Sequence, residues 1–192
     1  MITIIGISGS LRKGSFNTAL LRAAIELAPA GCTIEIGSIH GIPLYDGDVE
    51  EAEGVPVEVS ELQDRIAAAD GLLLTTPEYN NSMPGVLKNA IDWLTRPPNE
   101  LRRVFHGKPV AVIGATPGGF GTVLSQNAWL PVMRTLNTKL FTGNRLMVSG
   151  ANNVFNDKAQ LIDDAVRERL TAYINDFVAF IGNMGSDPIF HG

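Results

Sequence analysis

The chain has 192 residues, of which 45% are hydrophobic and 18% are charged, and its formal net charge is −5. This is the composition of an ordinary globular protein that is long enough to bury a substantial core. The acidic balance argues against nucleic acid as a partner, and no apolar run is long enough to span a membrane. Met1 leads directly into an apolar segment with no secretory signal, so we expect a cytoplasmic protein.

Cysteine and histidine usage excludes several kinds of chemistry. Cys32 is the only cysteine, so a disulfide, a thiol redox pair and a zinc cluster cannot form within one chain. The three histidines, His40, His106 and His191, have no metal-ligand spacing. We therefore expect no metal site and treat these four residues as structural or exposed.

Short apolar runs alternate with amphipathic segments along the chain. The runs predict strands over 2–7, 33–38, 71–76, 110–115 and, less regularly, 140–148. The segments between and after them predict helices over 18–25, 59–69, 86–94, 123–136 and 162–181. Pro131 lies inside the fourth of these, which predicts a kink or a late start there. Regular alternation predicts a parallel sheet with helices on both faces, in one domain over 1–182 with a loose tail over 183–192.

The segment from Ser8 to Asn17, SGSLRKGSFN, joins the first strand to the first helix. Such a turn leaves backbone N–H groups unpaired at the positive end of a helix, which favours an anion. Arg12 adds a planar fork suited to phosphate oxygens. The segment is neither a Walker loop nor the dinucleotide GxGxxG motif, and serine-rich turns also occur as plain helix caps. We expect this one to bind a phosphate.

The segment after the third strand, TPEYNNSMPG from Thr76 to Gly85, carries an aromatic ring, a carboxylate, two amides and a hydroxyl between two prolines. The prolines stiffen it. A flat ligand here can stack on Tyr79 and receive backbone hydrogen bonds. The alternative is a helix entry in which Ser82 is the cap and Tyr79 packs on the surface.

The segment after the fourth strand, from Ala115 to Gly121, places three glycines around one aromatic residue, which allows close backbone approach to a ligand. A bare structural turn is the alternative. In open α/β sheets, ligands bind at the carboxyl ends of the strands. The three loops together fit a mononucleotide with a flat aromatic head. FMN fits better than ATP because no acidic metal site accompanies the loops, and better than FAD because no second loop would hold an adenosine.

These loops resemble those of the NADPH-dependent FMN reductase family, a flavodoxin-like group that includes chromate, quinone and azo-dye reductases. The matching segments are GSLRKGSFN over 9–17, IPLYDGDVE over 42–50 and TPEYNNSMPGVLKNAIDW over 76–93. The resemblance covers the chain from the first strand to about residue 150. It implies an α/β, flavodoxin-like fold with a five-stranded parallel sheet in the order 2-1-3-4-5. It also implies bound FMN, with NADPH or NADH as the electron donor.

The resemblance further implies which residues bind the cofactor. The phosphate would be held by Ser10, Arg12, Ser15, Asn17 and Thr18. One edge of the ring would meet Pro77, Glu78, Tyr79, Asn80 and Ser82, and its other side would meet Thr116, Gly118 and Gly119. No catalytic side chain is expected, because the flavin carries the chemistry.

The function implied is an FMN-dependent NAD(P)H oxidoreductase that passes electrons, by a ping-pong hydride mechanism, to quinones, azo compounds, metal oxyanions or free flavin. Family members are homodimers or dimer-based tetramers with the third and fourth helices at the interface. This places Trp93, Leu94, Pro97 and Pro98 near the interface.

Two other functions compete with this one. The first is a flavodoxin-type electron carrier that does not oxidise NAD(P)H itself, and the second is a nucleotide-binding or regulatory domain without turnover. Carriers usually have threonine-rich phosphate loops without arginine and are far more acidic than this chain. The lack of a magnesium-binding constellation weakens a kinase or GTPase function. Lys88 and Asp92, four residues apart, are predicted to form an exposed ion pair.

Overall fold

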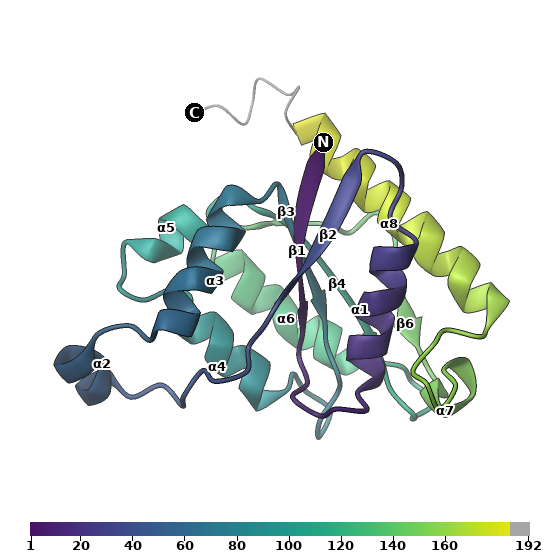
Figure 1. The fold of residues 1–192 in the computed structure, drawn as a ribbon, viewed down its shortest axis with the longest axis horizontal. Coiled ribbons are helices and arrows are strands. Elements are labelled where there is room, and N and C mark those ends of the chain that lie inside the picture. Colours follow the sequence, from purple (N-terminus) through teal and green to yellow (C-terminus); the bar gives the residue numbers. More distant parts are fainter. Residues whose placement is uncertain (185–192) are drawn as a thin grey trace.

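The computed structural model describes residues 1–184, which form a parallel sheet flanked by helices (Figure 1). The strands are β1 (Ile2–Ser8), β2 (Cys32–Gly37), β3 (Gly71–Thr75), β4 (Pro109–Ala115), β5 (Lys139–Leu140) and β6 (Met147–Val148). The helices are α1 (Phe16–Glu26), α2 (Gly47–Glu53), α3 (Val57–Ala68), α4 (Gly85–Trp93), α5 (Glu100–Val104), α6 (Val123–Thr135), α7 (Ala151–Val154) and α8 (Asp164–Met184). The strand order is β2-β1-β3-β4-β5, and β6 pairs with β4. This confirms the predicted flavodoxin-like order.

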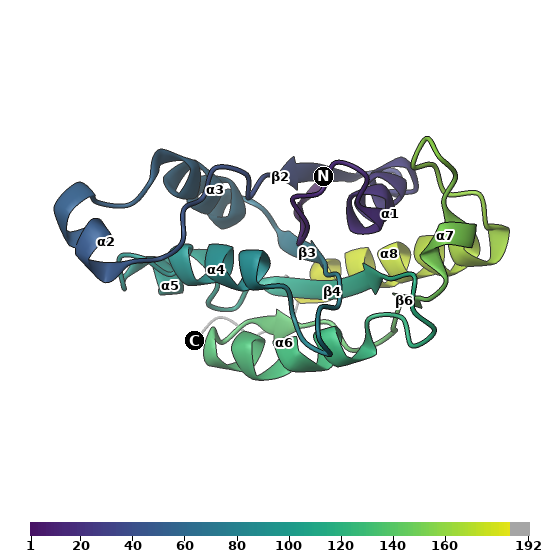
Figure 2. The same cartoon turned by 90° about the horizontal axis from the view of Figure 1, so that it is seen from below.

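Two hydrophobic cores lie on opposite faces of the sheet, because successive side chains of a strand point to opposite sides. Ile4 and Leu73 face the core that contains α1 and α8. Ile5 and Leu72, one position away, face the core that contains α3, α4 and α6. Viewed from below, α1 and α8 lie on one side of the sheet while α3, α4 and α5 lie on the other (Figure 2).

The predicted fifth strand is split. β5 ends at Leu140 and β6 begins at Met147, so the six residues between them leave the edge of the sheet. Phe141 N still donates to Val110 O at 2.8 Å, and β4 regains a partner where Gly114 N donates to Leu146 O at 3.4 Å. Along a strand, the N–H and C=O groups of every second residue point to the same neighbouring strand. Those of Val112, midway between Val110 and Gly114, therefore point into the gap between β5 and β6.

Helix boundaries differ from the sequence prediction at a few places. α6 begins at Val123 and continues through Pro131, so the late start is wrong. The short helices α2, α5 and α7 lacked a periodic pattern long enough to predict them. α8 ends at Met184, and the remainder of the predicted tail over 183–192 lies outside the described residues. No helix among the described residues is long and apolar enough to cross a membrane.

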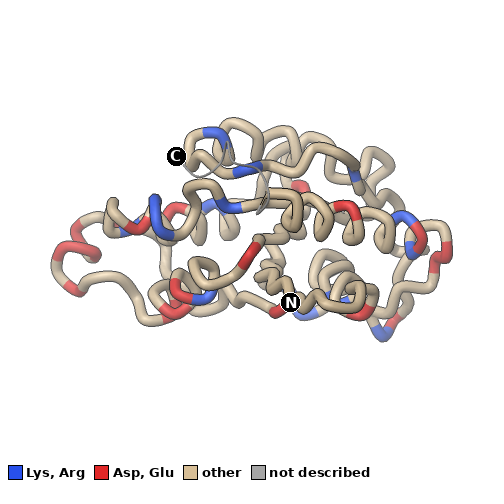
Figure 3. The backbone as a smooth tube through the Cα atoms, turned by 90° about the horizontal axis from the view of Figure 1, so that it is seen from above, with Lys and Arg blue, Asp and Glu red and all other residues tan. Residues whose placement is uncertain are grey.

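Helix α2 forms an arm that projects from the body of the molecule (Figure 1) and concentrates acidic residues (Figure 3). None of its residues is buried. Arg96 Nε donates to Glu50 Oε2 at 2.8 Å, and the Tyr45 hydroxyl donates to the same oxygen at 3.0 Å. The Tyr45 ring meets Trp93 edge-on, with ring centroids 5.0 Å apart. The hydrogen bond from Arg96 holds the pKa of Glu50 below its usual value. These contacts anchor an arm that has no core of its own.

At the β2 edge of the sheet, Arg65 covers part of the exposed backbone. Its Nη1 donates to Ile36 O at 3.0 Å, and its Nη2 pairs with Glu35 Oε2 at 3.1 Å. Elsewhere on the surface, Lys88 and Asp92 form the predicted exposed ion pair, with Nζ 2.7 Å from Oδ1.

Candidate active site at the carboxyl edge of the sheet

The three loops singled out in the sequence follow β1, β3 and β4, and all lie at one edge of the sheet, at the bottom of Figure 1. β1 lies between β2 and β3, so the chain reverses its direction across the sheet there. Such a switch point opens a crevice for a ligand. Gly9 N donates to Thr75 O at 2.8 Å, which ties the first loop to the end of β3.

The turn after β1 is wound around two serine side chains. Ser15 is the N-cap of α1, and its hydroxyl accepts from the backbone N–H of Asn17 at 3.2 Å and of Thr18 at 3.3 Å. The Ser10 hydroxyl accepts from Arg12 N at 3.3 Å. Both serines are buried, whereas Arg12 is exposed with its guanidinium 5.6 Å from the centre of the Phe16 ring.

This turn keeps a set of free hydrogen-bond donors and has no negative charge of its own. Among the described residues no partner is found for the backbone N–H groups of Leu11, Lys13, Gly14 and Phe16. The segment Ser8–Asn17 contains no Asp or Glu, and it stands at the start of α1, where the helix dipole is positive. Unpaired N–H groups, hydroxyls and a guanidinium around a helix N-terminus are the donors that a phosphate group needs.

Asn17 and Thr18 join the first loop to its neighbours. The Asn17 side chain donates to Ala115 O and accepts from Ala115 N, both at 2.9 Å. Thr75 Oγ1 donates to Asn17 O at 3.0 Å, and the hydroxyls of Thr18 and Ser8 lie 2.9 Å apart. The Asn17 side chain is thus engaged in holding the first loop against the end of β4.

The loop after β3 is a small hairpin. Tyr79 and Ser82 exchange two backbone hydrogen bonds of 3.0 Å, and Asn80 and Asn81 between them have φ values of 50° and 60°. Two successive left-handed residues form a type I′ turn, which asparagine tolerates. α4 begins at Gly85, and its N-cap is Pro84 with no side-chain hydrogen bond, so Ser82 is not the helix cap of the alternative prediction. Tyr79 remains 50% exposed.

Glu78 has a structural partner that the sequence did not reveal. Its Oε2 accepts from the backbone N–H groups of Leu124 at 2.8 Å and Ser125 at 3.0 Å, at the N-terminus of α6. A carboxylate in that position satisfies unpaired donors and the positive helix end. Beside it, the Thr76 and Ser125 hydroxyls lie 2.8 Å apart, and Trp129 Nε1 donates to Thr76 Oγ1 at 3.1 Å.

The end of β4 requires a glycine, and the loop that follows it is open. A Cβ on Gly114 would lie 2.2 Å from the backbone oxygen of Thr76, so only glycine fits there. Thr116 N donates to Val148 O at 2.9 Å, and Gly118 O accepts from Gly150 N at 3.3 Å. A Cβ on Gly119 would meet nothing within 4 Å, so this part of the loop is open to a ligand.

Sequence reasoning missed the buried hydroxyls that hold the loops together. Thr75, Thr76 and Ser125 are fully buried and lie beneath the loops. The only available signal was a pair of threonines at the end of an apolar strand. Cys32 lies outside this site, and burial raises the pKa of its thiol, which is typical of an unreactive cysteine.

The strand order β2-β1-β3-β4-β5, with helices on both faces of the sheet, defines a flavodoxin-like α/β protein. The sequence profile of the family described as NADPH-dependent FMN reductase matches residues 2–153. The chain belongs to this family and is an FMN-dependent NAD(P)H oxidoreductase.

Individual relatives agree with the family. An NAD(P)H-dependent FMN reductase of Pseudomonas aeruginosa is 48% identical over 167 residues, covering 87% of this chain and 88% of its own. A quinone reductase of Escherichia coli K12 is 36% identical over 94% of this chain and 95% of its own. The solved structure of FerB, a flavoenzyme NAD(P)H:(acceptor) oxidoreductase from Paracoccus denitrificans, superposes with a TM-score of 0.85. It is 32% identical and covers 95% of this chain and 98% of its own.

Proposed function

We propose that residues 1–182 form a single domain that holds FMN at this edge, with the phosphate on the Ser8–Asn17 turn. The ring would lie between the Tyr79–Ser82 hairpin and the loop that follows β4. The observation that carries the proposal is the group of unpaired N–H donors beside Arg12, in a turn without acidic residues. A phosphate is attracted there by both the donors and the helix dipole.

Each predicted residue would then have a definable part. Arg12, Ser10, Ser15 and Thr18 would bind the phosphate. Asn17 would act by holding the first loop in place through Ala115, since its side chain is already occupied.

The residues predicted to meet the ring also fall into two groups, those that would contact it and those that would hold a loop in position. Glu78 would place the hairpin through its bonds to α6, leaving the backbone of Pro77, Glu78, Tyr79 and Asn80 to meet the ring. The loop residues Thr116, Gly118 and Gly119 would approach the ring from its other side, with Ser82 fixing the hairpin.

When bound, FMN supplies the two-electron transfer chemistry. The chain would bind and orient the cofactor, and the exposed side chains of Tyr79 and Phe120, in the loops after β3 and β4, would border its ring. None of these side chains has to carry a proton. NAD(P)H and the acceptor would use the same open face in turn, which is a ping-pong order. Quinones are the first acceptors to test, followed by azo compounds, metal oxyanions and free flavin.

Steady-state kinetics with NADPH and a benzoquinone test this order. We expect parallel double-reciprocal lines when NADPH is varied at several fixed quinone concentrations, and intersecting lines would contradict a shared face. Anaerobic NADPH alone should bleach the flavin absorbance of the holoenzyme. An unbleached flavin would indicate a carrier that needs a separate reductase.

Oligomerisation is proposed on the basis of apolar side chains exposed around the site. They lie on α4, in the loop before α6 and at the start of α6, and they are Val86, Phe120 and Leu124. We propose a homodimer or dimer-based tetramer that covers them. Of the residues predicted near the interface, Trp93 and Leu94 are fully buried inside the protomer, whereas Pro97 and Pro98 are exposed and could contact a partner.

Light scattering at micromolar concentration measures this directly. Val86→Glu on α4 should weaken association, whereas Val57→Glu, a more exposed valine on α3, should leave it unchanged. A fully active wild-type monomer would contradict the proposal.

A further inference from the structure

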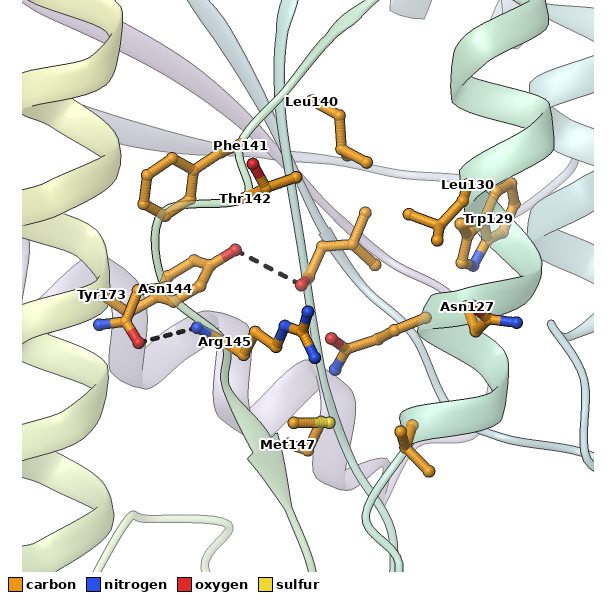
Figure 4. Close-up of a pocket in the computed structure, with 13 residues that line it drawn as sticks. Asn127, Trp129, Leu130, Leu140, Phe141, Thr142, Asn144, Arg145, Met147 and Tyr173 are labelled. Carbon is orange, nitrogen blue, oxygen red and sulfur yellow. Dashed lines mark hydrogen bonds between the residues drawn. The ribbon is translucent and has the colours of Figure 1, made fainter.

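A second pocket lies between α6 and α8, beside the split edge of the sheet (Figure 4). Its volume is about 220 Å³. This is below the roughly 300–1,000 Å³ of sites for drug-sized ligands, so the pocket suits a molecule with one ring. None of the residues assigned to FMN lines it. It is therefore separate from the proposed FMN site.

Aromatic and aliphatic side chains form most of the wall. Phe141 and Tyr173 meet edge-to-face with ring centroids 5.3 Å apart, and Leu140, Leu130 and Met147 complete the apolar surface. Aromatic rings pack favourably against such edges and faces. The wall therefore favours an aromatic ring over a linear chain.

The break between β5 and β6 exposes backbone groups of β4 to this pocket. The Val112 carbonyl accepts a hydrogen bond of 3.4 Å from the Tyr173 hydroxyl, which takes the place of the absent strand (Figure 4). For the Val112 N–H, no partner is found within residues 1–184. A backbone donor at a nearly buried position is costly without a partner, so a ligand oxygen would be favourable there.

Arg145 is the only charged residue that lines the pocket. Figure 4 shows its side chain reaching from the segment before β6 across the pocket toward α6. Among the described residues it forms no ion pair. An unpaired guanidinium at the mouth of an apolar pocket is suited to a carboxylate.

We propose that this pocket binds a small aromatic monocarboxylate, independently of the proposed function. The ring packs against Phe141, Tyr173 and Leu140. The carboxylate pairs with Arg145 and takes the Val112 N–H as a second donor. Met147 connects this site with the loop after β4, because a Cβ on Gly121 would lie only 2.8 Å from the Met147 Cβ.

Titration calorimetry of the FMN-saturated protein with benzoate tests the site. We expect saturable binding of one benzoate per chain, and its absence would overturn the proposal. Benzamide has the same shape without the charge, and its affinity should be lower than that of benzoate by about ten-fold or more. Equal affinity for the two probes would overturn the anion assignment.

Variants locate the binding. Arg145→Gln should weaken benzoate by about ten-fold or more, since it removes a charge-assisted hydrogen bond. The matched control is Arg169→Gln, an exposed arginine of α8 outside the pocket, which should bind like wild type. Arg12→Ala in the FMN turn should also leave benzoate binding unchanged. Wild-type affinity in Arg145→Gln, or loss in Arg12→Ala, would place benzoate elsewhere and refute the site.

Discussion

Asn17 and Ala115 are 98 positions apart and exchange two hydrogen bonds of 2.9 Å, one from the Asn17 amide and one to it. The amide takes the place of a strand partner for both backbone groups of Ala115. This pair joins the start of α1 to the end of β4, beneath two of the three loops that form the candidate site.

Asn17→Ala should therefore destabilise the fold. It leaves a buried N–H and a buried C=O without partners, which costs about 2–4 kcal/mol in free energy of unfolding. Urea denaturation of the apoprotein measures the change. Asn152→Ala, an exposed asparagine of α7, is the control and should lie within about 0.5 kcal/mol of wild type. A loss below about 1 kcal/mol in Asn17→Ala would show that water replaces the amide.

Arg12→Ala should weaken FMN with little effect on folding. The change removes one or two charge-assisted hydrogen bonds, so FMN affinity should fall about ten- to a hundred-fold, and less at high salt. Titration of FMN into apoprotein measures this, with Arg22→Ala, an exposed arginine of α1, as the control. NADPH oxidation should recover at saturating FMN. Unchanged affinity would contradict the phosphate assignment.

Gly114→Ala tests the close approach of the end of β4 to the residue that follows β3. The added methyl would lie 2.2 Å from the Thr76 oxygen, and backbone atoms cannot yield as a flexible side chain does. We expect a loss of about 1–3 kcal/mol in stability, as in other overpacked sites, together with weaker FMN binding. Gly85→Ala has open space around its Cβ and a permissive backbone, so it should be neutral or slightly stabilising. Stability equal to wild type in Gly114→Ala would show that the loops can separate freely.

The α2 arm should respond to acid. The pKa of Glu50 is lowered in the folded protein, chiefly by the hydrogen bond from Arg96. A carboxyl whose pKa is lower when folded stabilises the arm above its unfolded pKa, and that stabilisation is lost as pH falls through the folded pKa. The arm should hence loosen at acidic pH and stay in place at neutral pH.

An NMR titration of the Glu50 carboxyl carbon follows this directly. Arg96→Gln should raise its midpoint, and Arg102→Gln, an exposed arginine of α5, should not. The same midpoint in Arg96→Gln and wild type would refute the role of Arg96.

Periodicity predicted the main strands and helices because each buries a continuous apolar face. It failed at 140–148, because there the hydroxyl of Tyr173, and not a neighbouring strand, donates a hydrogen bond to the Val112 carbonyl of β4. The arm around Glu50 was equally hidden, since it is held by polar contacts with Arg96 and Tyr45 and has no apolar stripe.

Some parts of the candidate site were likewise recognisable from the sequence, and others were not. The segments around Arg12 and Tyr79 could be recognised because they combine ordinary turn residues with an arginine in the first and with an aromatic ring and a carboxylate in the second. The capping of α6 by Glu78 joins residues 46 positions apart, and no local pattern encodes such a pairing.

The two margins of the sheet also determine how this protein can assemble. An open strand edge is a template for another chain, and long flat edges lead to aggregation. Here one edge carries the charge of Glu35 and a carbonyl already bonded by Arg65. The opposite edge is reduced to two strands of two residues each. Neither edge offers a long, flat template to a foreign strand, so a concentrated solution of this protein should resist the formation of fibres.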